Sequence, residues 1–336
     1  MHHKIVALDA WNVPIPEDLL HLREPHTYEL ASHTSQLLST EAIQDAVRDA
    51  TIIATTVTPI KGATLDIANT PRLQLIVAIA VGTDCIDTDL AAARGIKVVN
   101  CPNANTETVA NHVLAMYFAG RRHLVQLHNT VLRTEEWPKN ALTYALNDPK
   151  GNPPITCKEE VVGIVGYGAI GRRIAELCGS LGMKVLIAAR KGAPASPDRA
   201  PFTQVLAQSS VLVLCVPRGP ETLGLISAPE LQAMSQHALL INVSRGGIVD
   251  EGALLEALRA GSIGGAASDV FQREPSGAGQ FWKEGDSPLL KVDAAEADRL
   301  NLVVTPHVAW CSTTTFHNYL QAFKRHVENF CEQQKR

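Results

Sequence analysis

The sequence predicts an α/β protein built from two doubly wound parallel sheets, and three observations lead to that prediction. Short apolar runs alternate with helical stretches along most of the chain, a pattern typical of parallel strands covered on both faces. The 336 residues exceed what one hydrophobic core usually fills. A glycine-rich strand-to-helix unit begins only near residue 161, so a separate domain must precede it.

The first hundred residues contain five candidate strands, over 4–10, 27–31, 51–57, 73–79 and 97–100. Helices are predicted over 40–48 and 88–94, the second ended by Gly95 as a C-cap. A long helical pattern then runs from Thr106 to Arg133, and we expect it to lead into the second domain. Its Arg121-Arg122 pair is interpreted as solvated or interfacial.

Residues 161–190 predict a dinucleotide-binding βαβ unit. An apolar strand runs into Gly166-Tyr167-Gly168-Ala169-Ile170-Gly171, which opens an amphipathic helix, and this is the context that a GxGxxG motif requires. Gly166 would allow a tight turn, Gly168 a close approach of backbone amides to a pyrophosphate, and Gly171 close packing of helix on strand. The alternative is a glycine-rich turn that binds nothing, but the flanking elements favour a nucleotide site.

The alternation of strands and helices resumes after Arg190. Strands are predicted over 211–216, 238–243, 265–270 and 301–305, and helices over 228–234, 252–259 and about 312–334. Residues 276–300 contain Gly, Pro and charge with little periodicity, so we expect an irregular surface excursion there.

Three polar residues follow strands of the second predicted sheet, at the edge where ligands of such sheets bind: Arg245, Glu274 and His307. An arginine can clamp a carboxylate, a histidine can exchange a proton with a reacting oxygen, and a carboxylate can orient that histidine. Each residue alone has an ordinary structural explanation as a loop or strand-end residue. Their joint placement favours a site that reduces a 2-oxo acid.

The chain resembles the D-isomer-specific 2-hydroxyacid dehydrogenase family. The matching segments are Val81-Gly82-Thr83-Asp84, 95–112, 162–171, 216–222, 241–258, 268–275 and 305–310. The resemblance implies a flavodoxin-like substrate domain, formed by 1–104 plus 308–336, and a Rossmann nucleotide-binding domain over 105–307. It also implies an interdomain cleft that holds the active site and a homodimer joined through the nucleotide-binding domains.

The resemblance implies roles for individual residues. Arg245 would bind substrate, His307 would be the general acid/base, Glu274 would pair with His307, and Asp269 would meet the nicotinamide carboxamide. The expected substrate-binding residues are Val81, Gly82, Thr83, Arg245 and Trp310. The expected cofactor-binding residues are Gly166, Tyr167, Gly168, Ala169, Ile170, Gly171, Arg190, Lys191, Val216, Pro217, Thr222, Val243, Ser244 and Asp269.

The second strand of the βαβ unit points to the cofactor. In NAD-binding units it ends in an acidic residue that binds the adenosine ribose, but here it ends Ala188-Ala189-Arg190-Lys191. Two cations in place of a carboxylate favour NADP(H), with NAD(H) possible if the pair is only a surface feature.

Composition argues against several other classes of protein. The formal net charge of −4 and the pI near 6.3 give no electrostatic footprint for nucleic acid or an anionic membrane. No apolar run reaches the length of a membrane span and no signal-peptide pattern opens the chain, so we expect a cytoplasmic protein. The seven cysteines lack CxxC and CxxH spacing, so neither a disulfide framework nor a metal site is expected.

The sequence therefore predicts an oxidoreductase that reduces a small 2-oxo acid to the D-2-hydroxy acid. The His307-Val308-Ala309-Trp310 segment resembles that of glyoxylate and hydroxypyruvate reductases, the glycerate dehydrogenases. One alternative is a nucleotide-sensing, corepressor-like interaction protein of the same fold. Another is a dehydrogenase for a bulkier 2-oxo acid.

Overall fold

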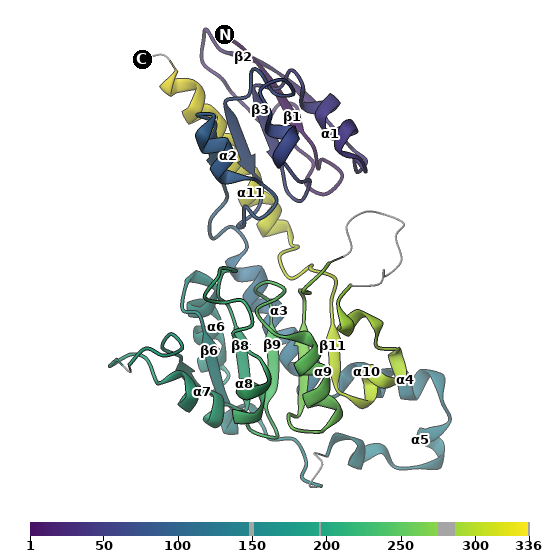
Figure 1. The fold of residues 1–336 in the computed structure, drawn as a ribbon. Helices are drawn as coiled ribbons and strands as arrows, with labels where there is room; N and C mark the ends of the chain where they lie inside the picture. Colours follow the sequence, from purple (N-terminus) through teal and green to yellow (C-terminus); the bar gives the residue numbers. More distant parts are fainter. Residues whose placement is uncertain (148–150, 195, 275–285, 335–336) are drawn as a thin grey trace. The chain divides into compact units, whose positions relative to one another are not determined.

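The computed structural model describes residues 1–147, 151–194, 196–274 and 286–334, and they fall into two compact units (Figure 1). The first unit contains Met1–Asn105 and the C-terminal segment from Cys311. The second contains most of Thr106 to Trp310. Among the described residues, no helix combines the length and the apolar character needed to cross a bilayer.

The first unit is a five-stranded parallel sheet with strand order β2-β1-β3-β4-β5. Its strands are β1 (His2–Ala7), β2 (Thr27–Ser32), β3 (Ile52–Thr55), β4 (Leu75–Ala78) and β5 (Lys97–Val99). This is the doubly wound order of flavodoxin-like folds. The helices are α1 (Thr40–Val47), α2 (Thr88–Ala93) and the C-terminal α11 (Thr313–Gln333), with a 3₁₀ turn at Gly62–Leu65.

Alternating strand residues of the first sheet build its two packed faces. Val6, Ile53 and Ile76 pack in one cluster with Ile43 and Val47 of α1. Their neighbours along the strands are equally buried, as Ile5, Ile52 and Leu75 all have no exposed surface. Helix α11 contacts β4 and runs along this sheet (Figure 1), where its Phe323 and Val327 are fully buried. Both faces are therefore covered, as a parallel sheet requires.

The second unit is a six-stranded parallel sheet with strand order β11-β10-β9-β8-β6-β7. Its strands are β6 (Val161–Val165), β7 (Lys184–Ile187), β8 (Val211–Leu214), β9 (Leu239–Asn242), β10 (Gly265–Ser268) and β11 (Leu302–Val304). Ala200 forms an isolated parallel bridge with Ala188, which directly follows β7. This bridge takes the place of a further strand next to β7 at the edge of the sheet. With that bridge the order matches the dinucleotide-binding arrangement, whose strand order reverses between β6 and β8.

Two hydrophobic clusters lie on opposite faces of this sheet. Leu212 and Leu214 of β8 pack with α7 (Phe202–Gln208), α8 (Ala228–Ala233) and α9 (Glu251–Arg259). Val211 and Val213 of the same strand pack with α3 (Thr106–Arg121) and α6 (Ala169–Ser180). The remaining helical segments are α4 (Leu124–Arg133), α5 (Glu136–Lys139), α10 (Ala294–Arg299) and the 3₁₀ turns Leu142–Leu146, Cys157–Glu159 and Pro288–Lys291.

The predicted helix over 106–133 is wrong as one continuous element. It breaks between α3 and α4, where His123 adopts a left-handed conformation with φ of 48°. The interpretation of Arg121 as solvated is also wrong. Its guanidinium donates to Glu160 Oε1 (2.6 Å) and to the Ser210 and His237 carbonyls, and Glu160 is completely buried. This buried ion pair ends α3 against the start of β6.

The expected irregular excursion over 276–300 is wrong for its second half. The 3₁₀ turn Pro288–Lys291 and helix α10 occupy it, and Asp293 caps α10 by accepting from the Glu296 N–H. Residues 276–285 lie outside the described residues. The sequence prediction also missed α7, which has no polar N-cap because Pro201 precedes it.

Candidate functional site

The glycine loop after β6 has the geometry expected of a pyrophosphate cradle. Gly166 has φ of +100°, and a Cβ there would lie 2.6 Å from the Cys215 carbonyl oxygen. A Cβ on Gly171 would lie 2.1 Å from the Gly166 oxygen, so only glycine allows α6 to start this close to the strand. A Cβ on Gly168 would meet nothing within 4 Å, so its backbone faces open space at the α6 N-terminus.

Cations gather where β7 ends. Arg190 is exposed, and within the described part of the chain its guanidinium forms no ion pair. Lys191 is already paired, because its Nζ lies 2.8 Å from Glu230 Oε1. Arg199, which sequence reasoning missed, places its guanidinium 5.5 Å from the centre of the Tyr167 ring and donates to the Ala188 carbonyl.

The loops after β8 and β9 are held by their own side chains. After β8, the Thr222 hydroxyl donates to the Pro217 carbonyl (2.7 Å), just beyond the half-buried Val216. After β9, Ser244 donates through both its N–H and its hydroxyl to Asn242 Oδ1 (3.1 and 2.7 Å). Val243 and Ser244 are buried beside this contact. These loops lie at the same carboxyl edge as the glycine loop.

The structure brings His307 and Glu274 into direct contact. His307 Nδ1 donates to Glu274 Oε2 at 2.8 Å, and the Phe271 N–H donates to Glu274 Oε1 at 3.1 Å. Burial alone raises the pKa of Glu274, but the hydrogen bond and charge of His307, with the Phe271 N–H and Arg245, outweigh it and lower the pKa. The carboxylate is therefore ionised at neutral pH. It holds the imidazole through Nδ1, so Nε2 is the ring nitrogen that Glu274 does not engage.

A close backbone approach brings Arg245 toward the same carboxylate. A Cβ on Gly246, the next residue, would lie 1.6 Å from the Phe271 carbonyl oxygen, so only glycine lets the two loops meet. Arg245 contributes to the lowered pKa of Glu274, although its Nη1 donates to the Ser244 carbonyl (2.8 Å). Arg245, Glu274 and His307 thus share one edge of the second sheet. Pro275, the residue after Glu274, lies outside the described residues.

Asp269 positions the segment that carries His307. The residue is 1% exposed, and its Oδ1 accepts from the Thr305 hydroxyl (2.6 Å) and the Val308 N–H (2.9 Å), while Oδ2 accepts from the Ala309 N–H (2.9 Å). These contacts hold the backbone of His307 at φ of 53°, a conformation that residues other than glycine rarely adopt. The carboxylate that was expected to meet the carboxamide is thus already engaged by the loop.

Trp310 packs beside the histidine segment. Its indole Nε1 donates to the His307 carbonyl (3.0 Å), and the ring is half-buried against the cluster that contains Ala309. The indole therefore fixes the backbone of His307 and also contributes to the core of the second unit.

Val81, Gly82 and Thr83 belong to the first unit and follow β4 at its carboxyl edge. All three are half-buried, and Asn100 Nδ2, just after β5, donates to the Val81 carbonyl (2.6 Å). The Thr83 carbonyl accepts from the Ile86 N–H (2.9 Å). Sequence reasoning missed Asn100, although it lies within the 95–112 segment that carries the family resemblance.

A further missed residue, Asp9, organises the same edge of the first sheet. It is 3% exposed, and its Oδ2 accepts from the backbone N–H groups of Thr56, Val57 and Thr58 at 2.7 to 3.1 Å. Burial alone raises the pKa of Asp9, but the hydrogen bonds from Thr58, Thr56 and Val57 outweigh it and hold the pKa below its usual value. The loop after β3 is therefore anchored on a buried carboxylate.

Comparison with known proteins identifies the family. The pattern of the D-isomer specific 2-hydroxyacid dehydrogenase, NAD binding domain, matches residues 114–309. The chain belongs to this family. It is an oxidoreductase with a parallel-sheet nucleotide-binding unit, as the glycine loop and the strand-end residues predicted.

Individual members of the dehydrogenase family match most or nearly all of the chain. A glycerate dehydrogenase from Methylorubrum extorquens is 36% identical over 334 residues, covering 98% of this chain and 96% of that protein. A glyoxylate reductase from Pyrococcus furiosus is 34% identical and covers 71% of this chain and 67% of its own length. The structure of an Aquifex aeolicus D-lactate dehydrogenase complexed with NAD and lactic acid has a TM-score of 0.75 at 23% identity, covering 98% and 96% of the two chains, and shares the fold.

Proposed function

We propose that this dehydrogenase reduces a small 2-oxo acid of the glyoxylate or hydroxypyruvate type to the D-2-hydroxy acid, with His307 as the general acid. The observation that carries the proposal is the 2.8 Å contact between His307 Nδ1 and an ionised Glu274, on the sheet edge that bears the glycine loop. The names of the glycerate dehydrogenase and glyoxylate reductase relatives support the substrate class.

The side chains have complementary tasks in this reaction. A reduced nicotinamide cofactor held at the Gly166–Gly171 loop would supply the hydride for this reduction. His307 gives the Nε2 proton to the keto oxygen, because Nδ1 is held by Glu274, and regains a proton from solvent. Arg245 binds the substrate carboxylate through its planar fork. We further propose that the first unit is the substrate domain and that its Val81–Thr83 backbone binds substrate.

Trp310 would limit the substrate to short side chains. Its indole is fixed by the hydrogen bond to the His307 carbonyl, so it cannot move aside without releasing that segment. The test is a panel of glyoxylate, hydroxypyruvate, pyruvate, phenylpyruvate and a branched 2-oxo acid, followed by the absorbance of the reduced nicotinamide. We expect glyoxylate and hydroxypyruvate to lead by about 10- to 200-fold in kcat/KM. A highest kcat/KM with phenylpyruvate or the branched acid would refute the small pocket.

We also propose that NADP(H) is the preferred cofactor. Arg190 is exposed after β7 and forms no ion pair with described residues, and Arg199 lies against Tyr167 of the glycine loop. A 2′-phosphate would give Arg190 a charged partner, and such a contact contributes about 1.5 to 3 kcal/mol. Because Lys191 is paired with Glu230, we assign it a smaller part.

Replacing Arg190 tests the cofactor assignment. Arg190→Ala should lower the ratio of kcat/KM with NADPH to that with NADH by about 10- to 100-fold. The exposed Arg72, which lies in the first unit, supplies the control Arg72→Ala, which should leave the ratio unchanged. Equal efficiency with both cofactors in the unmodified protein would contradict the proposal.

A homodimer joined through the second unit is the assembly we propose. Helix α4 has no buried residue although it carries Leu124, Val125, Val131 and Leu132, of which Leu132 is 69% exposed. Trp137 of α5 continues this apolar surface at 63% exposure. A second copy of the same surface would cover it through a two-fold axis.

A further inference from the structure

Two histidines and a cysteine meet at the amino-terminal edge of the first sheet. His3 lies at the start of β1, His26 directly precedes β2, and Cys331 lies in the last turn of α11. The three residues are 3%, 4% and 2% exposed. Val81 and Asp9 lie at the carboxyl edge of the same sheet, so the proposed reaction uses none of these three residues.

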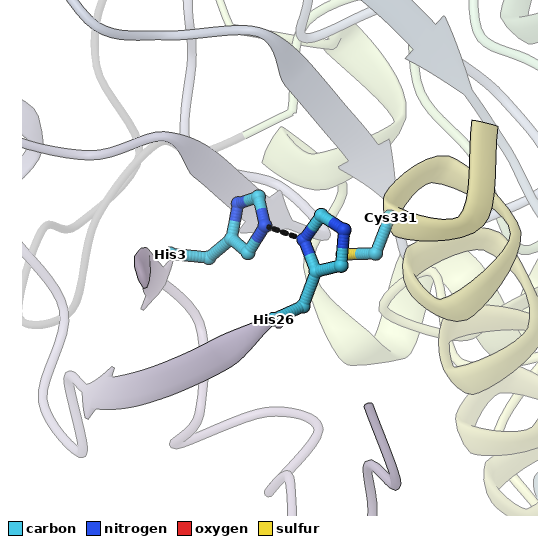
Figure 2. A group of neighbouring side chains, drawn as sticks. All are labelled: His3, His26 and Cys331. Atoms are coloured by element: carbon cyan, nitrogen blue, oxygen red, sulfur yellow. Dashed lines mark hydrogen bonds between the residues drawn. The ribbon is translucent and has the colours of Figure 1, made fainter. Parts of the chain in front are cut away.

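The potential ligand atoms lie close together. His3 Nε2 and His26 Nδ1 are 2.9 Å apart, and one nitrogen of each ring and Cys331 Sγ lie within 4.8 Å of one another (Figure 2). The two imidazole planes are only 15° apart, and the thiol approaches the His26 ring. Three segments far apart in the sequence supply these atoms, so the cluster is created by the fold.

The local environment leaves His3 and Cys331 uncharged at neutral pH. Burial, then the charge of neighbouring His26, lowers the pKa of His3 to about 4. Burial, then Glu328, raises the pKa of the Cys331 thiol to about 11. A neutral His3 imidazole keeps a lone pair for a metal ion. His3 Nδ1 is buried without a hydrogen-bond partner in the described part of the chain.

We propose that His3, His26 and Cys331 bind a transition-metal ion of the Zn²⁺ type, with solvent as the fourth ligand. Two imidazoles and one thiolate suit zinc, whereas calcium and magnesium require oxygen ligands. A cavity of about 420 Å³ adjoins the group and is lined by His26, Cys331, His21 and Glu328, among others. This cavity provides both an entry path and room for a water molecule.

Binding requires one ionisation and one tautomer change. Cys331 loses its thiol proton to solvent and forms the Zn–S bond. The proton shared between His3 Nε2 and His26 Nδ1 moves to the distal nitrogen of its own ring, so that both facing nitrogens can form Zn–N bonds. One proton is released per ion. Tetrahedral ligands with Zn–N bonds of about 2.0–2.1 Å lie roughly 3.3 Å apart, so the rings must separate by about 0.4 Å.

A bound ion would fasten α11 to the start of β1 and β2. No sequence pattern indicates this site, because its residues are separated by 23 and 305 positions and lack the short spacings of zinc motifs. The expectation that the protein has no metal site was drawn from those spacings alone. The structure assigns a candidate site that only tertiary folding creates.

The experiment uses the full-length protein after treatment with a chelator and a reductant. Zn²⁺ titrated by calorimetry should bind once per chain, and saturating Zn²⁺ should raise Tm by about 5 °C. Cys331→Ser and His26→Gln should each weaken Zn²⁺ binding by more than about 100-fold, which exceeds the loss of an outer-shell partner. Co²⁺ should give a thiolate charge-transfer band that Cys331→Ser abolishes.

His2→Asn is the matched control. His2 lies next to His3, but its ring is exposed and contacts Thr27. If any N-terminal histidine bound the ion, His2→Asn would lose Zn²⁺ binding. If the proposed site binds the ion, His2→Asn should retain it. Zn²⁺ binding that survives both Cys331→Ser and His26→Gln would overturn the proposal. Absence of the Co²⁺ band in the unmodified protein would do the same.

Discussion

His307 is held by two independent constraints that act on different parts of the residue. Its side chain is oriented by Glu274, and its left-handed backbone is fixed by the hydrogen bonds that Asp269 accepts on either side of it. A backbone of this kind costs roughly 1 to 3 kcal/mol and persists only where its surroundings enforce it. The buried Asp269 is thus a positioning residue for the proposed general acid.

Removal of the imidazole should disable proton transfer without affecting cofactor binding. We expect His307→Ala to lower kcat by roughly 10² to 10⁴ while the Kd of NADPH stays nearly constant. Steady-state kinetics and fluorescence titration of NADPH measure the two quantities. His33→Ala, a histidine outside the site, is the control, and near-normal turnover in His307→Ala would remove the general-acid assignment.

The Glu274 carboxylate should control the alkaline side of the pH profile. Its lowered pKa keeps it ionised through the working range, and an ionised carboxylate favours the protonated imidazole that reduction needs. Glu274→Gln removes this charge, so the alkaline limb of kcat/KM should move to lower pH. A limb that stays in place would show that Glu274 does not couple to the proton donor.

The candidate site could be predicted only where it depends on strand ends. Arg245, Glu274 and His307 each follow an apolar run, so parallel topology alone implied that they share one edge. The task of Asp269 could not be foreseen, because its partners at 305–309 lie some 36 to 40 positions away. The same holds for Asp9, which binds residues 55–58.

At the scale of elements, the strands were predicted better than the helix ends. A parallel strand buried on both faces is a short apolar run, and such runs are visible in the sequence. The break between α3 and α4 was not visible, since His123 adopts a left-handed conformation in place of the usual glycine. The break matters because it starts the separate helix α4 with its exposed apolar residues.

The apolar surface of α4 should mediate dimerisation. Leu132→Glu places a charge on a side chain that is 69% exposed in the single chain, so it should not impair folding but should weaken self-association at least about 10-fold. Light scattering after size-exclusion chromatography over a concentration series reports the mass. Leu38→Glu alters an equally exposed leucine of the first unit and should leave the dimer intact. A monomer in the unmodified protein would contradict the assignment.

For the whole molecule, acid should weaken the first unit through Asp9. Because the pKa of this carboxyl is lower in the folded protein, its stabilising effect is present above the usual value near 3.8 and is lost as pH falls through the folded-state pKa. Asp9→Asn should lower the free energy of unfolding at pH 7 by about 2 to 3 kcal/mol. As the pH falls toward 3, the free energy of unfolding should decrease less steeply in Asp9→Asn than in the unmodified protein. Urea unfolding at several pH values measures both effects, and Asp18→Asn is the exposed control. An unchanged slope in Asp9→Asn would exclude this carboxyl as the source.

The first unit is interrupted in the chain, whereas the second is nearly continuous. Helix α11 is held in the first unit by hydrogen bonds from Asn318 to Ala104, Lys324 to Leu19 and His326 to Asn100. On the ribosome, the five strands of the first sheet therefore emerge about 200 residues before the helix that covers one of their faces. At a translation rate of about 5–20 residues per second, that apolar face remains uncovered for roughly 10 to 40 s. The second unit can finish folding during this interval, so the domain that begins first in the sequence is completed last in time.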